Sequence, residues 1–533
     1  MVVKTPRLTR RKFLIATGAL AAAACTPTSP GGIARPSTSG GKATYGGTVT
    51  MALENDVINF DPLKSNAFVD RNVHYQIYDS LVRVDDTGKI IPWLATKWEA
   101  SSDGKTVTFT LRDDVAFHDG SKFDAANVKW NIERYQKTTG SARTGELASV
   151  ASVDAPNATT AVFNLKTPFS PLLANLIDRA GMMVSQKAYQ AIGNPDDFTR
   201  KAFKAGSGPF MLTDAVKDDH MTLEKNPNWW GTDKDGSKLP YLDKIIVKPI
   251  TSSDLRFTNL KTGDAQVANA IAGKDVPAAK SDSSLNYQER AAYGFRSLIP
   301  NRAKGYVFEE GRYVKAVSMA IDRAELLHSG YFDLGVAGYG TIAPSHFAFD
   351  PNFKPFEKAD PDGAKKLIDA VGKPLTFELL VPAGDPALLT ISQLMKAQLS
   401  KAGITANLNQ LEFAKILELQ TAHTFAGLTF VGWSGRVDPD GNTYDHVYTK
   451  RPFNDSSYTN ANVDKFLDQE RATTDEAQRR TAFRSAEQIY VVDDPARIWL
   501  GFAAAQLVTS KKLKAPPVYA DQIVRYHLMS MAQ

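Results

Sequence analysis

A short loop near residue 435 carries the side chains best suited to hold a small polar ligand. Residues 432–440 read Gly-Trp-Ser-Gly-Arg-Val-Asp-Pro-Asp. They place an aromatic ring, a guanidinium and two carboxylates on a glycine-rich segment. Binding residues often lie on loops that a rigid scaffold positions, and ligand pockets combine apolar walls with a few polar groups. The segment therefore predicts a ligand-binding loop. The candidate ligand-binding residues are Glu54, Trp433, Arg436 and Asp438.

Catalytic signatures are absent from the sequence. It contains no G-x-S-x-G, no H-E-x-x-H and no Walker loop, and its eight histidines are scattered. Residues 338–343 match the dinucleotide fingerprint G-x-G-x-x-A, but Pro344 stands where the phosphate-binding helix should begin. A flexible loop is the better interpretation of this segment. We therefore expect no catalytic residue, no cofactor and no enzyme activity.

Two acidic segments have the first spacings of a calcium-binding loop. The pattern that begins at Asp233 has Lys244 at its twelfth position, and the pattern that begins at Asp438 has Thr449 there. A calcium loop needs a bidentate glutamate at that position. We therefore expect an ordinary Asp-Gly turn near residue 235 and no metal site.

The N-terminus has the pattern of an export signal. Basic residues up to Lys12 precede an apolar run from Phe13 to Ala24, and about 12 apolar residues are too few to span roughly 30 Å of hydrocarbon. Residues 1–24 are therefore predicted to be a signal peptide. The pair Arg10-Arg11, followed by Lys-Phe-Leu, resembles the twin-arginine signal, whose route carries folded cargo.

Cys25 is the only cysteine and directly follows three alanines, where a bacterial lipoprotein is cut and acylated. Ala22 departs from that pattern, which usually has a larger aliphatic residue, so ordinary cleavage to a soluble product stays open. Residues 25–44 are rich in Pro, Gly, Ser and Thr, which predicts a tether with a mean reach of about 25 Å. A plain disordered terminus is the alternative. One cysteine allows no internal disulfide.

The formal charge of +5 comes from the signal segment, and the chain that remains after its removal is neutral. Five of the 63 basic residues lie in the signal segment, which has no acidic residue, and the remaining 58 equal the 58 acidic residues. A neutral chain without a basic tract gives no support to nucleic-acid binding, which depends on phosphate neutralisation.

The elements that position these residues alternate between strands and helices. About 490 residues follow the tether, too many for one core. Residues 106–111 alternate polar and apolar, as in a half-buried strand, whereas the apolar set over 312–328 forms one helical face. Residues 388–399 predict a helix that Gly403 closes before a strand over 404–408. We therefore expect α/β lobes packed together.

Short motifs in a fixed order resemble the extracytoplasmic solute-binding proteins of family 5, the peptide, opine and nickel class. The resemblance covers essentially the whole mature chain. Each motif is weak alone, and the ordered set is specific. The motifs are Asp61-Pro62, Tyr78 to Leu81, Gly88 to Trp98, Ser102 to Gly104, Thr108 to Arg112, Phe117 to Gly120, Gly206 to Phe210, Asn226 to Gly231, Leu239 to Asp243, Val317 to Arg323, Gly432-Trp433 and Asp438 to Asp440.

This resemblance implies a two-lobed α/β periplasmic-binding-protein fold, type II-like in its large family 5 variant. Residues 45–270 with 501–533 would form lobe I, and residues 271–500 would form lobe II. A solute would lie in the cleft between lobes that close over it. The implied partners are the permease and ATPase subunits of an ABC importer. We expect a monomer in the periplasm or cell envelope, anchored to the membrane by lipid on Cys25.

The resemblance also makes Arg436 conspicuous. In peptide-binding relatives, the loop after the Gly-Trp pair carries an aspartate that pairs with the ligand ammonium, and here Arg436 stands about where that carboxylate is expected. Its planar fork suits a carboxylate or phosphate, which predicts an acidic peptide, an opine or a sugar derivative as ligand. Alternatively, Arg436 pairs internally with Asp438 or Asp440 and shapes the turn. Asp438 would then be free to bind an ammonium group.

Other functions are compatible with a tethered α/β protein. An envelope hydrolase needs a nucleophile with its base, or a metal, and the sequence offers neither clearly. A chaperone or chemoreceptor partner can use the same fold, because function depends on the site and its partners.

Overall fold

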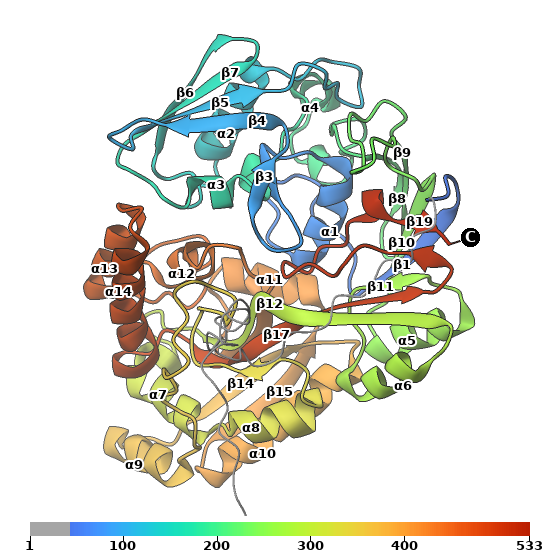
Figure 1. The fold of residues 1–533 in the computed structure, drawn as a ribbon. Helices are drawn as coiled ribbons and strands as arrows, with labels where there is room; N and C mark the ends of the chain where they lie inside the picture. Colours follow the sequence, from blue (N-terminus) through green and yellow to red (C-terminus); the bar gives the residue numbers. More distant parts are fainter. Residues whose placement is uncertain (1–42, 533) are drawn as a thin grey trace, which may run out of the picture. The chain divides into compact units, whose positions relative to one another are not determined.

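A mixed eleven-stranded sheet runs through the computed structural model, which describes residues 43–532 (Figure 1). The predicted signal peptide, Cys25 and the tether up to residue 42 lie outside the described residues. β13 (Val336–Ala337) pairs with β17 beside the main path. The strand order is β15 (Thr405–Leu411), β14 (Thr376–Pro382), β16 (Leu428–Trp433), β12 (Leu285–Pro300), β17 (Ile498–Ser510), β11 (Val267–Ala268), β1 (Thr48–Leu53), β10 (Lys244–Pro249), β9 (His220–Lys225) and β8 (Phe210–Val216).

The two long strands β12 and β17 join the halves of this sheet. They pair antiparallel from Leu285 opposite Ser510 to Leu298 opposite Ile498. On one side, β11 and β10 flank β1 in parallel, and on the other side β15 and β16 flank β14 in parallel. The register of β12 against β17 shifts on either side of residues 295 and 296. The predicted lobe boundaries at residues 270 and 500 remain a prediction.

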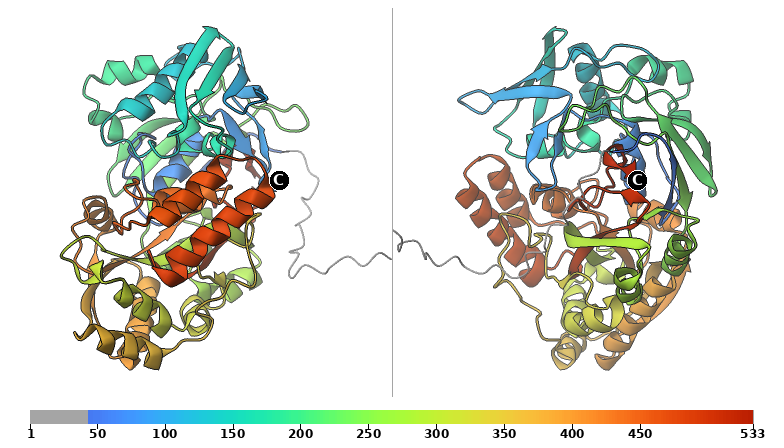
Figure 2. Two further views of the ribbon diagram at one scale, coloured as in Figure 1. Left: turned by 90° about the vertical axis from the view of Figure 1, so that its left-hand side faces the viewer. Right: turned by 45° about the vertical axis from the view of Figure 1, so that its right-hand side comes forward.

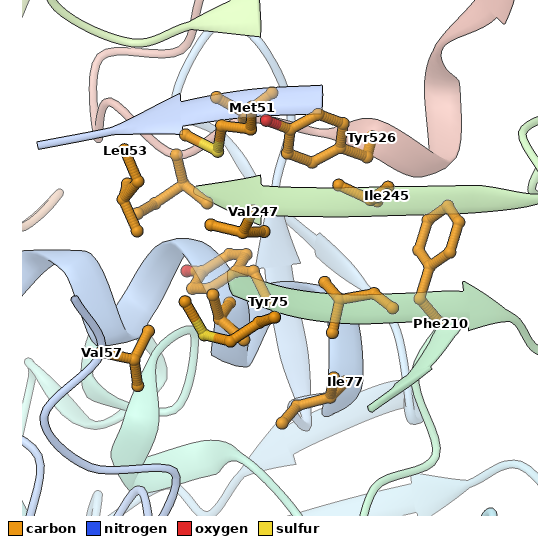
Figure 3. Close-up of a cluster of buried hydrophobic side chains, with 14 of the residues drawn as sticks. Met51, Leu53, Val57, Tyr75, Ile77, Phe210, Ile245, Val247 and Tyr526 are labelled. Carbon is orange, nitrogen blue, oxygen red and sulfur yellow. The ribbon is translucent and has the colours of Figure 1, made fainter. Parts of the chain in front are cut away.

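The first half of the sheet is covered by α1 (Phe68–Ile77), which contributes Tyr75 and Ile77 to a buried apolar cluster (Figure 3). Side chains of β1 and β10 meet them there, among them Met51 and Val247. Burying one large apolar side chain contributes about 1.5–3 kcal/mol. This cluster therefore fixes the C-terminal end of β1, where Glu54 follows.

A separate antiparallel sheet has its own core and was not anticipated from the sequence. Its order is β4 (Ala95–Ala100), β5 (Thr106–Leu111), β7 (Thr160–Leu165) and β6 (Val150–Asn157), and it lies beside α2 (Ala125–Lys137) (Figure 2). Asp124 caps α2 by accepting a hydrogen bond from the backbone N–H of Asn127 at 2.9 Å. The predicted strand over 106–111 is confirmed by β5.

The helix predicted over 312–328 is interrupted. α7 (Gly311–Ala320) ends before Ile321, and Asp322 starts α8 (Arg323–Glu325), which continues as a π-helical turn to Gly330. The Asp322 side chain accepts from the N–H of Glu325 at 2.9 Å, so it caps a new helix. Helical spacing of apolar residues persists across the break, which is why the sequence pattern concealed it.

The next predicted helix is confirmed by α10 (Pro386–Lys401), after which Gly403 has a φ of +72° and β15 begins at Thr405. The Asp-Gly turn is also present, since the Asp233 carboxylate accepts from the N–H groups of residues 235 and 237. The loop expected to be flexible at 338–343 is instead buried. There, a Cβ on Gly340 would lie 2.0 Å from Oε1 of Glu487.

Three of the seven tryptophans surround one buried carboxylate. Asp79 accepts the indole N–H of Trp93 at 2.7 Å and those of Trp229 and Trp230 at 3.2 Å each. Ser207 donates a fourth hydrogen bond at 3.1 Å. Burial raises the pKa of Asp79, and Arg83 and the indoles oppose that shift. These three tryptophans therefore belong to the packed interior around Asp79.

Further helices complete the two halves, and α13 lies beside α14 (Figure 2). They are α3 (Leu172–Asn175), α4 (Gln186–Ile192), α5 (Ser253–Thr262), α6 (Val276–Ser281), α9 (Pro361–Val371), α11 (Phe413–Thr421), α12 (Asp440–Val447), α13 (Ala461–Arg471) and α14 (Glu476–Glu487). The small strand pairs are β2 (Val82–Val84) with β3 (Ile90–Pro92) and β18 (Leu513–Lys514) with β19 (Ser530–Met531).

Candidate functional site

A cavity of about 350 Å³ lies where the two halves of the sheet meet. The end of β1 and the start of α5 contribute one part of its wall, and β12, β16, β17 and α10 contribute the rest. Most of the lining is apolar, with a few charged and amide groups. The polar and aromatic side chains of the lining include Glu54, Arg256, Asn269, Arg296, Tyr331, Asp385 and Trp433.

Trp433 stands in the cavity wall at the end of β16, as predicted for a binding residue. Its indole N–H donates to Oδ1 of Asn442 at 3.0 Å, and its ring contacts the rings of His446 and Phe453 with centroid separations of 4.4 and 5.1 Å. These contacts fix the orientation of the indole. Its role in ligand binding remains a prediction.

Glu54 also lines the cavity, directly after β1. Burial raises the pKa of this carboxyl group, while Arg256 and Asn269 act in the opposite direction. Oε2 of Glu54 and Oδ1 of Asn269 are both buried without a hydrogen-bond partner among the described residues. These are two buried acceptors of a kind that normally has a hydrogen-bond donor.

Arg256 is held by the protein itself. Its Nε donates to the carbonyl of Ala270 at 2.9 Å, and its Nη1 donates to the carbonyls of Ile250 and Thr251 at 2.8 Å each. Its Nη2 lies 4.0 Å from Oδ2 of Asp385. This guanidinium has its donors largely occupied and serves as a fixed positive charge beside Glu54.

Arg436 does not line the cavity. It is 6% exposed, its guanidinium stacks 4.4 Å from the Trp433 ring centroid, and its Nε lies 3.5 Å from Oδ2 of Asp178. Gly435, with a φ of +82°, turns the chain just before it. Burial lowers the pKa of Arg436 to about 10, and neighbouring Arg71 adds to the shift. Arg436 therefore has a protein partner, Asp178, in place of Asp438 or Asp440, the two aspartates considered from the sequence.

Those two aspartates are occupied by arginines of α13 and α14. Asp438 accepts from Nη2 and Nη1 of Arg479 at 2.7 and 2.8 Å, and Asp440 accepts from Nε and Nη2 of Arg471 at 2.6 and 2.9 Å. Asp438 therefore lies outside the cavity wall, in an ion pair that shapes the loop. Glu54 and Trp433 both line the cavity, whereas Arg436 and Asp438 are not part of its lining.

Comparison with known proteins decides the class of this chain. The family model described as "Bacterial extracellular solute-binding proteins, family 5 Middle" matches residues 89–455. The chain belongs to family 5 of the bacterial extracellular solute-binding proteins. Members of this family are binding proteins and not enzymes, so the predicted family, its solute-binding role in ABC importers, the absence of enzyme activity and the extracytoplasmic location are confirmed.

Relatives of this family 5 protein match along nearly the whole chain. It is 26% identical over 535 residues to the glutathione-binding protein GsiB of Pectobacterium atrosepticum, covering 97% of this chain and 98% of that protein. The corresponding protein of Escherichia coli K12 is 25% identical over 474 residues, covering 87% and 90%.

Solved structures confirm the predicted two-lobed fold class. The periplasmic binding protein DppA from Helicobacter pylori, in complex with the peptide STSA, superposes with a TM-score of 0.83 at 23% identity, covering 92% of this chain and 99% of that one. The oligopeptide-binding protein AppA from Bacillus subtilis, in complex with a nonapeptide, gives 0.84 at 20% identity, covering 92% and 100%.

Two further observations apply to the described part of this family 5 protein. Within residues 43–532, no helix is long and apolar enough to cross a membrane. The same residues contain no cluster of three or more His, Cys, Asp or Glu side chains arranged to hold a metal ion.

Sequence reasoning missed Arg296 and Tyr331, which line the cavity. Arg296 lies in β12 and Tyr331 follows the π-helical turn, 35 positions apart and outside any motif. Only the pairing of β12 with β16 places Arg296 near Trp433, so no local signal in the sequence could have identified it.

Proposed function

We propose that this family 5 protein captures a small peptide-like solute in the cavity and delivers it to the permease of an ABC importer. The observation that carries this proposal is the lining of the cavity, where the Trp433 ring lies together with buried polar atoms that have no hydrogen-bond partner within residues 43–532. A volume of about 350 Å³ lies at the lower end of ordinary small-molecule sites. A short peptide or amino-acid derivative suits this size better than a long chain.

The polar groups favour a ligand with N–H donors. Oε2 of Glu54 and Oδ1 of Asn269 are acceptors, and an unpaired buried acceptor is unfavourable by about 1–3 kcal/mol until a donor reaches it. Peptide amides and ammonium groups supply such donors. The names of the relatives, which refer to glutathione and to peptides, support the same class of solute.

Binding would be coupled to lobe closure. The solute would contact Glu54 after β1 and Trp433 after β16 at the same time, and such a ligand favours the state in which both walls approach it. The lobes proposed for this motion are residues 45–270 with 501–533, and residues 271–500.

Calorimetry with a panel of di- and tripeptides, glutathione included, tests the solute class. A ligand at 100 times its Kd should also raise the free energy of unfolding by about 2.7 kcal/mol if it binds only the folded state. Mass spectrometry of co-purified solute provides an independent identification. The proposal fails if no peptide or amino-acid derivative binds and the co-purified solute belongs to another chemical class.

Anchoring at the membrane forms the second part of the proposal. Cys25 would carry lipid after export by a twin-arginine route and removal of residues 1–24 by a signal peptidase, and residues 26–44 would act as the tether. The Cys25→Ala variant should move from the membrane fraction to the soluble fraction. If wild type itself is found without lipid, the anchor is ruled out, although solute binding is not.

A further inference from the structure

Arg296 is a positive charge in the cavity wall with room around it. It lies in β12 between Gly432 of β16 and Gly501 of β17, so neither neighbouring strand places a side chain beside it. The register of β12 against β17 also shifts directly after Arg296. Arg296 is half-buried and belongs to the cavity lining.

No carboxylate among residues 43–532 forms an ion pair with Arg296. Its contacts are a long hydrogen bond from Nη1 to the carbonyl of Phe502 at 3.4 Å and the ring of Tyr331, 4.1 Å from its guanidinium carbon. Arg323 shows how the fold treats a structural arginine that lacks a carboxylate. That guanidinium donates to three carbonyl oxygens at 2.7, 3.0 and 3.2 Å.

The Tyr331 hydroxyl is a second polar group near Arg296. It is buried and has no hydrogen-bond partner among the described residues, although a buried tyrosine hydroxyl normally finds one. The residue lines the cavity together with Arg296. The Tyr331 ring contacts the Arg296 guanidinium, so the two residues offer several donors, and within residues 43–532 the only recorded acceptor for them is the carbonyl of Phe502.

We propose that Arg296 and Tyr331 form an anion subsite that binds a carboxylate of the solute. This inference rests on the proposed function and narrows its ligand class to solutes with a free carboxylate. A planar carboxylate matches the guanidinium fork with two parallel hydrogen bonds, and the tyrosine hydroxyl can donate a third. A phosphate is the weaker match because its second negative charge would face only one unpaired cation.

The subsite also explains why the protein keeps a half-buried positive charge that no carboxylate among residues 43–532 neutralises. Removing a cation from water without a partner destabilises the free protein, and a ligand carboxylate restores the missing interaction. Burial indeed lowers the pKa of Arg296 from its ordinary value. If Arg296 were retained for structure alone, its removal would instead destabilise the free protein.

Calorimetry on Arg296→Gln tests the subsite, with Arg312→Gln as the matched control. Arg312 is half exposed and pairs with Glu310 at 2.6 Å, so both variants lose one positive charge. The probes are glutathione and trialanine, each as the free acid and as the amide in which every carboxylate is converted, which means both carboxylates of glutathione. Losing a charge-assisted pair should weaken binding of the acid about 10- to 100-fold in Arg296→Gln and leave it unchanged in Arg312→Gln.

Three further readouts exclude a merely structural role. Tyr331→Phe should weaken the acid about 2- to 10-fold, and Arg296→Lys should restore part of the affinity because it keeps the charge but loses the fork. Without ligand, Arg296→Gln should melt at the wild-type temperature or above it. Equal affinity of acid and amide in wild type, or a lower melting temperature of free Arg296→Gln with unchanged binding, overturns the inference.

Failure of the proposed function is distinguishable from failure of the subsite. If wild type binds neither probe, the peptide-like class is in doubt, and the subsite is judged with sodium acetate as the smallest carboxylate. Acetate should raise the melting temperature of wild type and Arg312→Gln, and raise that of Arg296→Gln less. An equal shift in all three proteins overturns the subsite, whatever the natural solute is.

Discussion

Replacing Asp178 with asparagine removes a negative charge that lies among three buried arginines, Arg71, Arg179 and Arg436. Oδ2 of Asp178 lies 2.7 Å from Nε of Arg71 and 3.5 Å from Nε of Arg436, and its Oδ1 accepts the backbone N–H of Arg179 at 2.8 Å. The Asp178 and Arg71 side chains are 3% and 2% exposed. Burial alone would raise the pKa of Asp178, but Arg71, Arg436 and Arg179 outweigh it and hold the pKa well below its ordinary value.

The expected loss of stability is large because the arginines remain buried. Removing one partner of a buried ion pair destabilises a protein by about 3–5 kcal/mol, since the other charge is left uncompensated. Asparagine keeps the shape and can still accept the N–H of Arg179, so the loss should come mainly from charge. The free energy of unfolding should therefore fall by about 3–5 kcal/mol in Asp178→Asn.

Urea unfolding followed by tryptophan fluorescence at pH 7 measures this loss, with Asp114→Asn as the control. Asp114 pairs with Arg112 at 2.5 Å but is 54% exposed, and exposed pairs contribute only about 0–1 kcal/mol. Salt should weaken the effect of Asp114→Asn and leave that of Asp178→Asn nearly unchanged. If the two variants lose the same stability within about 1 kcal/mol, the argument from burial is wrong.

Two other predictions concern stability. Burial lowers the pKa of His346 to about 4, below the ordinary 6.5, so between these pH values the unfolded chain binds a proton that the folded chain does not. The stabilising contribution of the neutral ring is complete above pH 6.5 and decreases as the pH falls. The destabilisation by His346→Gln should therefore be about 2 kcal/mol smaller at pH 5 than at pH 7.5. An equal loss of stability at both pH values would argue against a neutral buried ring. A Cβ on Gly206 would lie 1.6 Å from the carbonyl oxygen of Ile77, so Gly206→Ala should lower the free energy of unfolding by at least about 1–3 kcal/mol. A Cβ on Gly432 would have its nearest contact at 3.6 Å. In the same urea assay, Gly432→Ala should therefore change the free energy of unfolding by less than about 0.5 kcal/mol.

Local sequence patterns predicted the elements in which one face is buried. Alternation identified β5, and four-residue and three-residue steps identified α10. The break at Asp322 escaped because apolar spacing continues across it while a side-chain cap starts a new helix. The separate sheet of β4 to β7 escaped for another reason, since its boundaries depend on which strands pair, and a sequence pattern does not encode pairing.

The residues considered for ligand binding show the same division. Trp433 was found because its loop combines glycine with aromatic and charged residues, a signal confined to nine positions. The same loop led to the prediction of Arg436 as a ligand contact, and the structure places Arg436 beside Asp178, which lies more than 250 positions away. Arg296 and Tyr331 carry no local signal at all. Within residues 43–532, what distinguishes them is that no carboxylate pairs with Arg296 and that the Tyr331 hydroxyl has no hydrogen-bond partner.

The pairing of β12 with β17 has a consequence for how the chain acquires its structure. The two strands are separated by about 200 positions, and together they connect both halves of the large sheet. During synthesis, β12 emerges long before its partner and must wait with one edge uncovered until residues 498–510 arrive. Pairings of this kind close large loops and form slowly, and an uncovered strand edge recruits other chains. Nascent chains that stop short of β17 should therefore aggregate or require a chaperone, and fusing a fluorescent reporter after residue 533 would follow completion of the sheet in the cell.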